Sequence, residues 1–226
     1  YQNSTQGIPM VRPVFYQQKQ PENDLQTWSY FWGPSLLVSP VVEKNEQKHT
    51  LWLPKGKWYN WWTGEVYKGA RKIKIQNHIQ ELPLFARGGS FIPMIHPIQN
   101  TDEYATDTLI IHYFLAHQPH QENFTLFVDD GKDALSIDSS HFELIHLLSN
   151  EKKHALAIQL VSENHGFDKK PQKRYIKMMI HTDTSMPLSF KQKEKKEEIE
   201  ILRISPFLYQ VTFDWEGRSF SLDISW

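Results

Sequence analysis

Short runs rich in β-branched and aromatic residues recur along most of this chain, and Gly, Pro, Asn or Asp separates each run from the next. Runs of this kind are typical of β-strands. We expect strands at 35–42, 50–53, 58–62, 72–75, 82–85, 108–115, 124–128, 142–149, 155–161, 174–180, 198–204, 208–213 and 219–224. A single helix is expected at 23–31, with Asn23 as its N-cap. Many short strands and few helices predict antiparallel sandwiches rather than βαβ units.

Composition narrows the functions that such a chain can have. The chain has 226 residues with 39% hydrophobic, enough for one or two cores, and its net charge of -1 lacks the basic excess that nucleic acids demand. The absence of Cys excludes disulfides, thiolate metal sites and cysteine nucleophiles. No apolar run approaches the roughly 20 residues that a bilayer-spanning helix needs, so we expect a soluble protein without a membrane partner.

Two stretches interrupt the pattern and suggest how the chain is divided. The polar stretch 98–107, "IQNTDEYATD", is the expected boundary between two β-domains. Near the start, "GIPMVRPVFY" has the continuous apolar character of a strand buried on both faces, yet this chain holds no parallel partner for it. We therefore expect a piece of a longer polypeptide, in which partners of this strand and any signal peptide lie upstream of Tyr1. The compartment is not readable from such a piece.

Several segments, in order, resemble glycoside hydrolase family 31, the α-glucosidase and α-xylosidase group. "TQGIPMVRPVFY" resembles the last strand of the family's (β/α)8 barrel, and "WSYFWGPSLLVSPVV" resembles the entry into its proximal C-terminal β-domain. "LWLPKGKWYNWWTGEVYKGARKI" and "LPLFARGGSFIPM" are similar to a hairpin and to the end of that domain. "ENFTLFVDDGKD" resembles a turn of the distal C-terminal domain, although "ALSIDSSHFE" follows where relatives often continue with a tyrosine and a glycine.

The resemblance implies a mainly β fold in which two consecutive antiparallel β-sandwich domains follow a remnant of the barrel. The implied ranges are 1–24 for the barrel remnant, 25–100 for the proximal domain and 101–226 for the distal domain. Without the rest of the barrel, Val11, Val14 and Phe15 should lose their partners and become exposed. The partners implied are the upstream barrel of the same polypeptide and the carbohydrate substrate of the parent enzyme, and no cofactor is implied.

The parent implied by the resemblance is a retaining enzyme that uses two carboxylates to hydrolyse α-linked glucosides or xylosides. Active sites of such barrels lie at the C-terminal ends of the strands. Because only the last strand is expected here, no catalytic residue is assigned to this chain, and the chain alone is predicted to be inactive.

The segment "KGKWYNWWTG", residues 55–64, is the main candidate for ligand contact. In an extended strand, alternate side chains face opposite sides, so both faces of this hairpin would carry aromatic rings. Rings on both faces favour packing and domain docking over a sugar platform, which needs one exposed face. Contact with a sugar by Trp58, Trp61 or Trp62 remains the alternative.

Acidic and histidine residues suggest no metal site. Asp129 and Asp130 are adjacent on a Gly turn, and Asp133 does not complete an EF-hand spacing, so a turn role is expected. The histidines His112, His117 and His120 lack an acidic ligand at helical spacing.

Two functional hypotheses follow. In the first, the chain is the non-catalytic C-terminal part of a family-31-like α-glycosidase and supports its barrel. In the second, it is a carbohydrate-binding module that grips a glycan through surface Trp residues.

Overall fold

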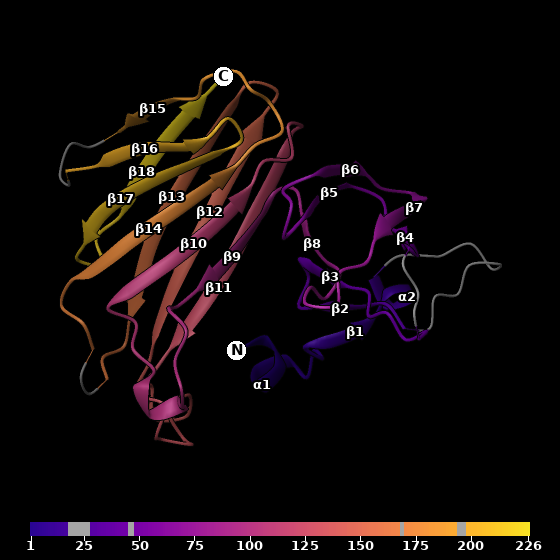
Figure 1. The fold of residues 1–226 in the computed structure, drawn as a ribbon. Helices are drawn as coiled ribbons and strands as arrows, with labels where there is room; N and C mark the ends of the chain where they lie inside the picture. The colour runs from indigo at the N-terminus through magenta and orange to yellow at the C-terminus, as the bar shows by residue number, and fades with distance from the viewer. Residues whose placement is uncertain (18–27, 45–47, 168–169, 194–197) are drawn as a thin grey trace. The chain divides into compact units, whose positions relative to one another are not determined.

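The β-rich pattern of the sequence is realised in strands that separate into two groups. The computed structural model describes residues 1–17, 28–44, 48–167, 170–193 and 198–226. Contacts between Cα atoms divide the chain into an N-terminal unit, residues 2–90, and a C-terminal unit, Tyr1 with residues 91–226 (Figure 1). Each unit has its own buried cluster of apolar side chains. The domain ranges predicted from the sequence remain a proposal.

The N-terminal unit contains a six-stranded sheet, a two-stranded sheet and two short helices. The six-stranded sheet has the order β1 (Val11–Pro13), β2 (Tyr30–Trp32), β3 (Leu36–Val38), β8 (Leu84–Arg87), β5 (Lys57–Asn60) and β6 (Val66–Lys68). The two-stranded sheet pairs β4 (Lys48–Leu53) with β7 (Arg71–Gln76), and the helices are α1 (Gln2–Gln6) and α2 (Val14–Gln17). Its core gathers Val14, Phe31, Leu37, Leu51, Leu53, Trp58, Ile73, Ile75 and Phe85.

The C-terminal unit is a sandwich of two five-stranded sheets (Figure 1). The first sheet has the order β16 (Glu200–Ser205), β17 (Leu208–Trp215), β14 (Arg174–His181), β10 (Thr108–Phe114) and β9 (Ser90–Met94). The second has the order β11 (His120–Val128), β12 (Glu143–Lys152), β13 (Ala155–Asn164), β18 (Phe220–Ser225) and β15 (Ser189–Gln192). A 3-10 turn, η2 (Thr101–Glu103), lies between β9 and β10 and is capped by Asn100.

Strand periodicity explains how the sandwich closes. Along β14, residues 174, 176, 178 and 180 are buried while their neighbours are more exposed, and β17 buries residues 209, 211, 213 and 215. Side chains of adjacent strand residues point to opposite faces, so each sheet presents one apolar face to the other. One core cluster joins strands of both sheets, for example Ile111 on β10, Ile145 on β12 and Leu222 on β18.

The mainly β, sandwich-like fold class predicted from the sequence is confirmed, and each of the thirteen expected strands overlaps a strand of the structure. One pairing departs from an all-antiparallel arrangement, because β10 and β14 run parallel. Four strands were missed, namely β2, β6, β9 and β15, all between three and five residues long, whereas β1 lies within the stretch 7–16 that was expected to hold a strand.

The expected helix at 23–31 falls mostly on residues 18–27, outside the described residues. At its end the prediction is wrong, because residues 30–32 form β2 rather than helix. Phe31 is fully buried between the more exposed Tyr30 and Trp32, so the local period is two.

A barrel strand is not seen in the described part of 1–24. Its only strand, β1, is three residues long and pairs antiparallel with β2. Val11 and Phe15 are exposed as expected, at 57% and 65%. Val14 corrects the prediction, because it is 2% exposed and packs in the core of the N-terminal unit. No helix among the described residues has the length and apolar character required to cross a bilayer.

Residues 191–198, "KQKEKKEE", mix charges of both signs, a pattern that predicts a solvated hairpin end, but the strands β15 and β16 on either side do not pair with each other. Residues 194–197 are outside the described residues. The two strands pair with different partners, β15 with β18 and β16 with β17. This stretch therefore connects the two sheets of the sandwich.

Candidate functional site

Trp58 is a core residue of the N-terminal unit. Its side chain is fully buried, its ring lies 6.0 Å from that of Phe31, and its Nε1–H donates to the backbone carbonyl of Pro54 at 2.8 Å. An indole buried in this way contributes apolar burial while keeping its one donor satisfied. The burial of Trp58 favours the packing interpretation of the aromatic hairpin.

Trp61 and Trp62 lie in a turn rather than in a strand. Strand β5 ends at Asn60, whose Oδ1 accepts hydrogen bonds from the backbone N–H groups of Trp62 and Thr63. The expected alternation of faces therefore stops two residues before the end of the aromatic run. Trp62 is 48% exposed, and its Nε1–H donates to the carbonyl of Leu82 at 2.7 Å, which fixes the ring in place. Sugar contact by Trp58, Trp61 or Trp62 stays a prediction.

Exposed apolar side chains gather around β1 in the N-terminal unit. Val11 stands directly opposite Trp32 in the β1–β2 pair, and the carbonyl of Met10 accepts from the N–H of Gly33 at 2.7 Å. Helix α2 follows β1 immediately and carries two more exposed rings. We call these residues the β1 apolar patch: Met10 at 63%, Val11 at 57%, Phe15 at 65%, Tyr16 at 56% and Trp32 at 59% exposure. Clustered exposed apolar residues mark surfaces that contact another protein or a ligand.

The carboxylates of Asp129 and Asp130 accept hydrogen bonds from groups within or near their own turn. Asp129 Oδ1 accepts from the N–H of Gly131, and its Oδ2 accepts from the hydroxyl of Ser136. Asp130 Oδ1 accepts from the N–H groups of Lys132 and Asp133, which lowers the pKa of Asp130. Both carboxylates thus stabilise the turn, as the sequence predicted.

The histidines are distributed over separate contacts. His112 on β10 meets His181 on β14, with Nδ1 of the first 2.8 Å from Nε2 of the second. Burial lowers the pKa of His112 to about 4; burial and then the neighbouring His112 lower that of His181 to about 3. Elsewhere in the sandwich, His117 Nε2 lies 2.8 Å from Asp183 Oδ1. Across the described ranges, no three His, Asp or Glu side chains are grouped so that they could hold a metal ion.

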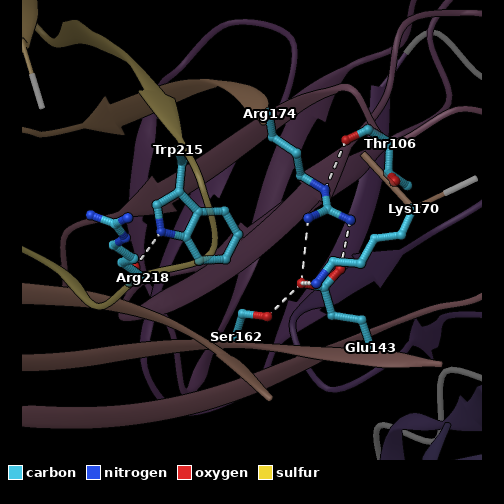
Figure 2. A network of polar contacts seen from close by, with 7 residues as sticks. All are labelled: Thr106, Glu143, Ser162, Lys170, Arg174, Trp215 and Arg218. Atoms are coloured by element: carbon cyan, nitrogen blue, oxygen red, sulfur yellow. Dashed lines mark hydrogen bonds and ion pairs between the residues drawn. The ribbon is translucent and has the colours of Figure 1, made fainter. Parts of the chain in front are cut away.

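A buried ion pair links the two sheets of the C-terminal unit (Figure 2). Glu143 on β12 is fully buried, and its Oε2 lies 2.6 Å from Nη2 of Arg174 on β14. Lys170 Nζ lies 3.1 Å from the other oxygen of Glu143, which also accepts from the hydroxyl of Ser162. Arg174 Nε–H completes the network by donating to the carbonyl of Thr106 at 3.1 Å.

A second buried carboxylate ties down the loop after β10. Glu151 is 1% exposed and accepts from the hydroxyl of Tyr113 and from the N–H groups of Ala116 and His117. Burial raises the pKa of Glu151. Both buried carboxylates, those of Glu143 and Glu151, are thus engaged by partners within the sandwich.

Neither buried carboxylate was expected from the sequence, although the strand pattern contains a signal for Glu143. Glu143 shares the period-two face of β12 with Ile145 and Leu147. Arg174 shares the face of β14 with Ile176 and Met178. Opposite charges on the apolar faces of two strands indicate a buried pair, because a charge on such a face requires a partner.

Comparison with known proteins decides the family. Residues 7–92 match the family model described as the glycosyl hydrolase family 31 C-terminal domain. This segment is a family 31 domain. The resemblance derived from the sequence motifs is therefore confirmed, and the family 31 match covers the N-terminal unit almost entirely.

The relatives that this chain matches are considerably longer. An alpha-glucosidase of Saccharolobus solfataricus is 40% identical over 93 residues, which cover 40% of this chain and 13% of that protein. An alpha-xylosidase of the same organism is 27% identical over 155 residues, covering 67% of this chain and 20% of that protein. The chain thus corresponds to a fifth or less of the length of these two relatives.

The fold also recurs in solved structures of the family. A family 31 dextranase of Flavobacterium johnsoniae, complexed with glucose, matches with a TM-score of 0.82. The match covers 99% of this chain and 30% of that chain at 19% identity. At this identity the likeness shows the fold alone, and it extends over both units of the chain.

Proposed function

We propose that this chain forms the non-catalytic C-terminal β-domains of a family 31 α-glycosidase and that it packs against an upstream (β/α)8 barrel of the same polypeptide. The proposed domains are a barrel remnant at 1–24, a proximal domain at 25–100 and a distal domain at 101–226. The parent would hydrolyse α-linked glucosides or xylosides by a retaining mechanism with two carboxylates. The chain alone would be inactive.

The β1 apolar patch is the observation that carries this proposal. It lies within the segment that matches the family model, and its five side chains are each more than half exposed. Relatives contain several times more chain than this, so the proposed occupant is the upstream catalytic domain. Burial of these side chains would hold the barrel and its loops in the geometry that catalysis requires.

A hydrophobic dye tests the patch in the chain itself. We expect the dye to bind this chain and to bind much less to the chain in which Val11→Asp and Trp32→Ser are combined. Leu135→Asp is the matched control, because Leu135 is 62% exposed but lies in the C-terminal unit outside the patch. Equal dye binding by the Val11→Asp, Trp32→Ser variant and by the unsubstituted chain would argue against an exposed docking surface.

The same variants test docking in the parent polypeptide. Val11→Asp should lower the thermal unfolding midpoint and the hydrolytic activity of the parent, whereas Leu135→Asp should leave both nearly unchanged. If Val11→Asp changes neither the unfolding midpoint nor the activity of the parent polypeptide, the proposed interface is contradicted.

A carbohydrate-binding module remains the second candidate function, and the exposure of Trp62 favours it. The ring of Trp62 is half exposed and is held by its hydrogen bond to Leu82, as a stacking platform for a sugar must be. Trp61 is its neighbour in the turn, whereas Trp58 is buried. This function predicts that iodide quenches tryptophan fluorescence, that Trp62→Ala removes the quenching, and that added maltotriose reduces it. Quenching that maltotriose leaves unchanged would oppose this function.

A further inference from the structure

A surface groove opens in the C-terminal unit where β14 begins, β16 begins and β17 ends. Its volume is about 690 Å³, which falls in the range of small-molecule sites. The three strands are neighbours in one sheet (Figure 1), so the groove rests on paired backbone. Because β17 pairs antiparallel with both β14 and β16, the lining residues far apart in sequence come together here.

Tyr175 provides an aromatic surface in this groove. It stands opposite Asp214 in the β14–β17 pair and is 42% exposed. Residues 174 and 176 on either side of it are buried, so the period of the strand turns the Tyr175 ring to the outer face of the sandwich. Thr212 lies two residues before Asp214 on the same face, and its hydroxyl is 3.5 Å from the carboxylate of Glu200. The ring is therefore beside a row of hydrogen-bonding side chains.

The charges that line the groove are largely paired. Lys173 Nζ lies 2.8 Å from Asp214 Oδ2, and Arg218 lies 3.8 Å from Glu216. Two further carboxylates, those of Glu198 and Glu200, also line it, so acidic groups outnumber basic ones. An anionic ligand would be repelled, whereas a neutral ligand with many hydroxyl groups would find acceptors without having to separate an ion pair.

We propose that this groove binds a neutral oligosaccharide of the glucose series. One apolar face of a pyranose ring would stack on Tyr175, and its hydroxyl groups would donate to the carboxylates of Glu200 and Asp214. The sugar class rests on the proposed function, since the same glycan would be the substrate of the parent.

The test measures saccharide binding by this chain, in two-dimensional NMR titrations with maltotriose and with isomaltotriose. We expect saturable shifts of the backbone signals of residues 173–175 and 212–216. Tyr175→Ala should weaken binding about tenfold, in line with the energy of an aromatic contact, while Tyr175→Phe should retain it. Tyr104→Ala is the matched control, because Tyr104 is also 42% exposed and lies in the same unit outside the groove.

Three outcomes would overturn the proposal. They are the absence of saturable shifts with either sugar, binding that Tyr175→Ala leaves unchanged, and binding that Tyr104→Ala weakens equally. A basic peptide such as pentalysine that occupies the groove while sugars do not would assign the acidic lining to a different ligand. If the chain binds no saccharide but the parent enzyme hydrolyses α-glucosides, the groove proposal fails and the proposed function holds. If the parent enzyme is inactive but the chain binds saccharide at Tyr175, the proposed function fails and the groove proposal holds.

Discussion

At the scale of single residues, Glu143 and Arg174 form a buried ion pair between the two sheets of the C-terminal unit. Each side chain is almost fully buried, and their carboxylate and guanidinium groups meet across the sandwich (Figure 2). Removing one partner from a buried ion pair leaves an unpaired charge in a medium that solvates it poorly. Loss of one partner should therefore cost more stability than replacement of both by apolar side chains.

Glu143→Gln should lower the free energy of unfolding by about 3 kcal/mol, because Arg174 and Lys170 would then lack a counter-charge. The double variant Glu143→Leu with Arg174→Met should cost clearly less than either single charge removal. Denaturant unfolding followed by circular dichroism measures both.

The exposed pair Lys173–Asp214 is the control for that series. Its side chains are 57% and 55% exposed, so Asp214→Asn should change stability by less than about 1 kcal/mol. Similar losses for Glu143→Gln and Asp214→Asn would show that burial does not set the cost.

The histidine pair predicts how stability depends on pH. His112 and His181 stay neutral in the folded chain down to pH values near 4 and 3, whereas unfolded histidines take up a proton near pH 6.5. The unfolded state therefore binds more protons below about pH 6.5, and stability should fall on acidification by on the order of 1 kcal/mol per pH unit for each residue.

Unfolding midpoints measured from pH 7.5 to pH 4.5 test this dependence. The double variant His112→Gln with His181→Gln should flatten the loss of stability, while His141→Gln, at an exposed position, should not. An unchanged slope in the double variant would assign the pH dependence to other groups.

At the scale of elements, the aromatic hairpin of β5 and β6 illustrates how much the sequence predicts. The density of Trp and Tyr indicated a packed β-structure, and the burial of Trp58 and Tyr59 agrees. The turn at Trp61 and Trp62 was not predicted, because it depends on the side-chain amide of Asn60 bonding two backbone N–H groups. Period-two patterns identify long strands well, but strands of three residues such as β2 and β6 present too few side chains for a period.

The candidate surfaces were predicted less completely than the strands. Exposure of Val11 and Phe15 followed from the expected loss of an upstream partner, whereas Val14 folds into the N-terminal core. The Tyr175 groove was not foreseen, because it is assembled by strand pairing, which brings Tyr175 opposite Asp214, 39 positions away, and Glu200 opposite Thr212, 12 positions away. The spacing of residues within one strand does not predict which strands pair.

Gly69 is the position at which the hairpin should be most sensitive to substitution. A Cβ atom there would lie 1.8 Å from the carbonyl oxygen of Pro54, the same oxygen that accepts from Trp58. Gly69→Ala should therefore displace backbone and lower the free energy of unfolding by more than about 2 kcal/mol.

Gly64→Ala is the control for this prediction. Gly64 has a φ of +72°, but a Cβ there has open space around it, so its cost should be only about 1 kcal/mol from backbone strain. Thermal unfolding of both variants gives the comparison, and an equal cost at the two positions would exclude the close approach at Gly69 as the cause.

At the scale of the whole molecule, residues 7–92 match the family 31 C-terminal domain, and the relatives of the chain carry much more sequence. The buried carboxylates of Glu143 and Glu151 are engaged in structural contacts, and five exposed apolar side chains form the β1 apolar patch. These features agree with a supporting role in which the chemistry resides in the upstream part of the parent polypeptide.

The most direct test of this account is a paired assay with an aryl α-glucoside and an aryl α-xyloside, run on this chain and on the parent polypeptide that includes the upstream region. We predict hydrolysis of at least one substrate by the parent and none by the chain alone. Hydrolysis by the chain alone would contradict the supporting role, and would place catalytic groups among its own carboxylates and histidines.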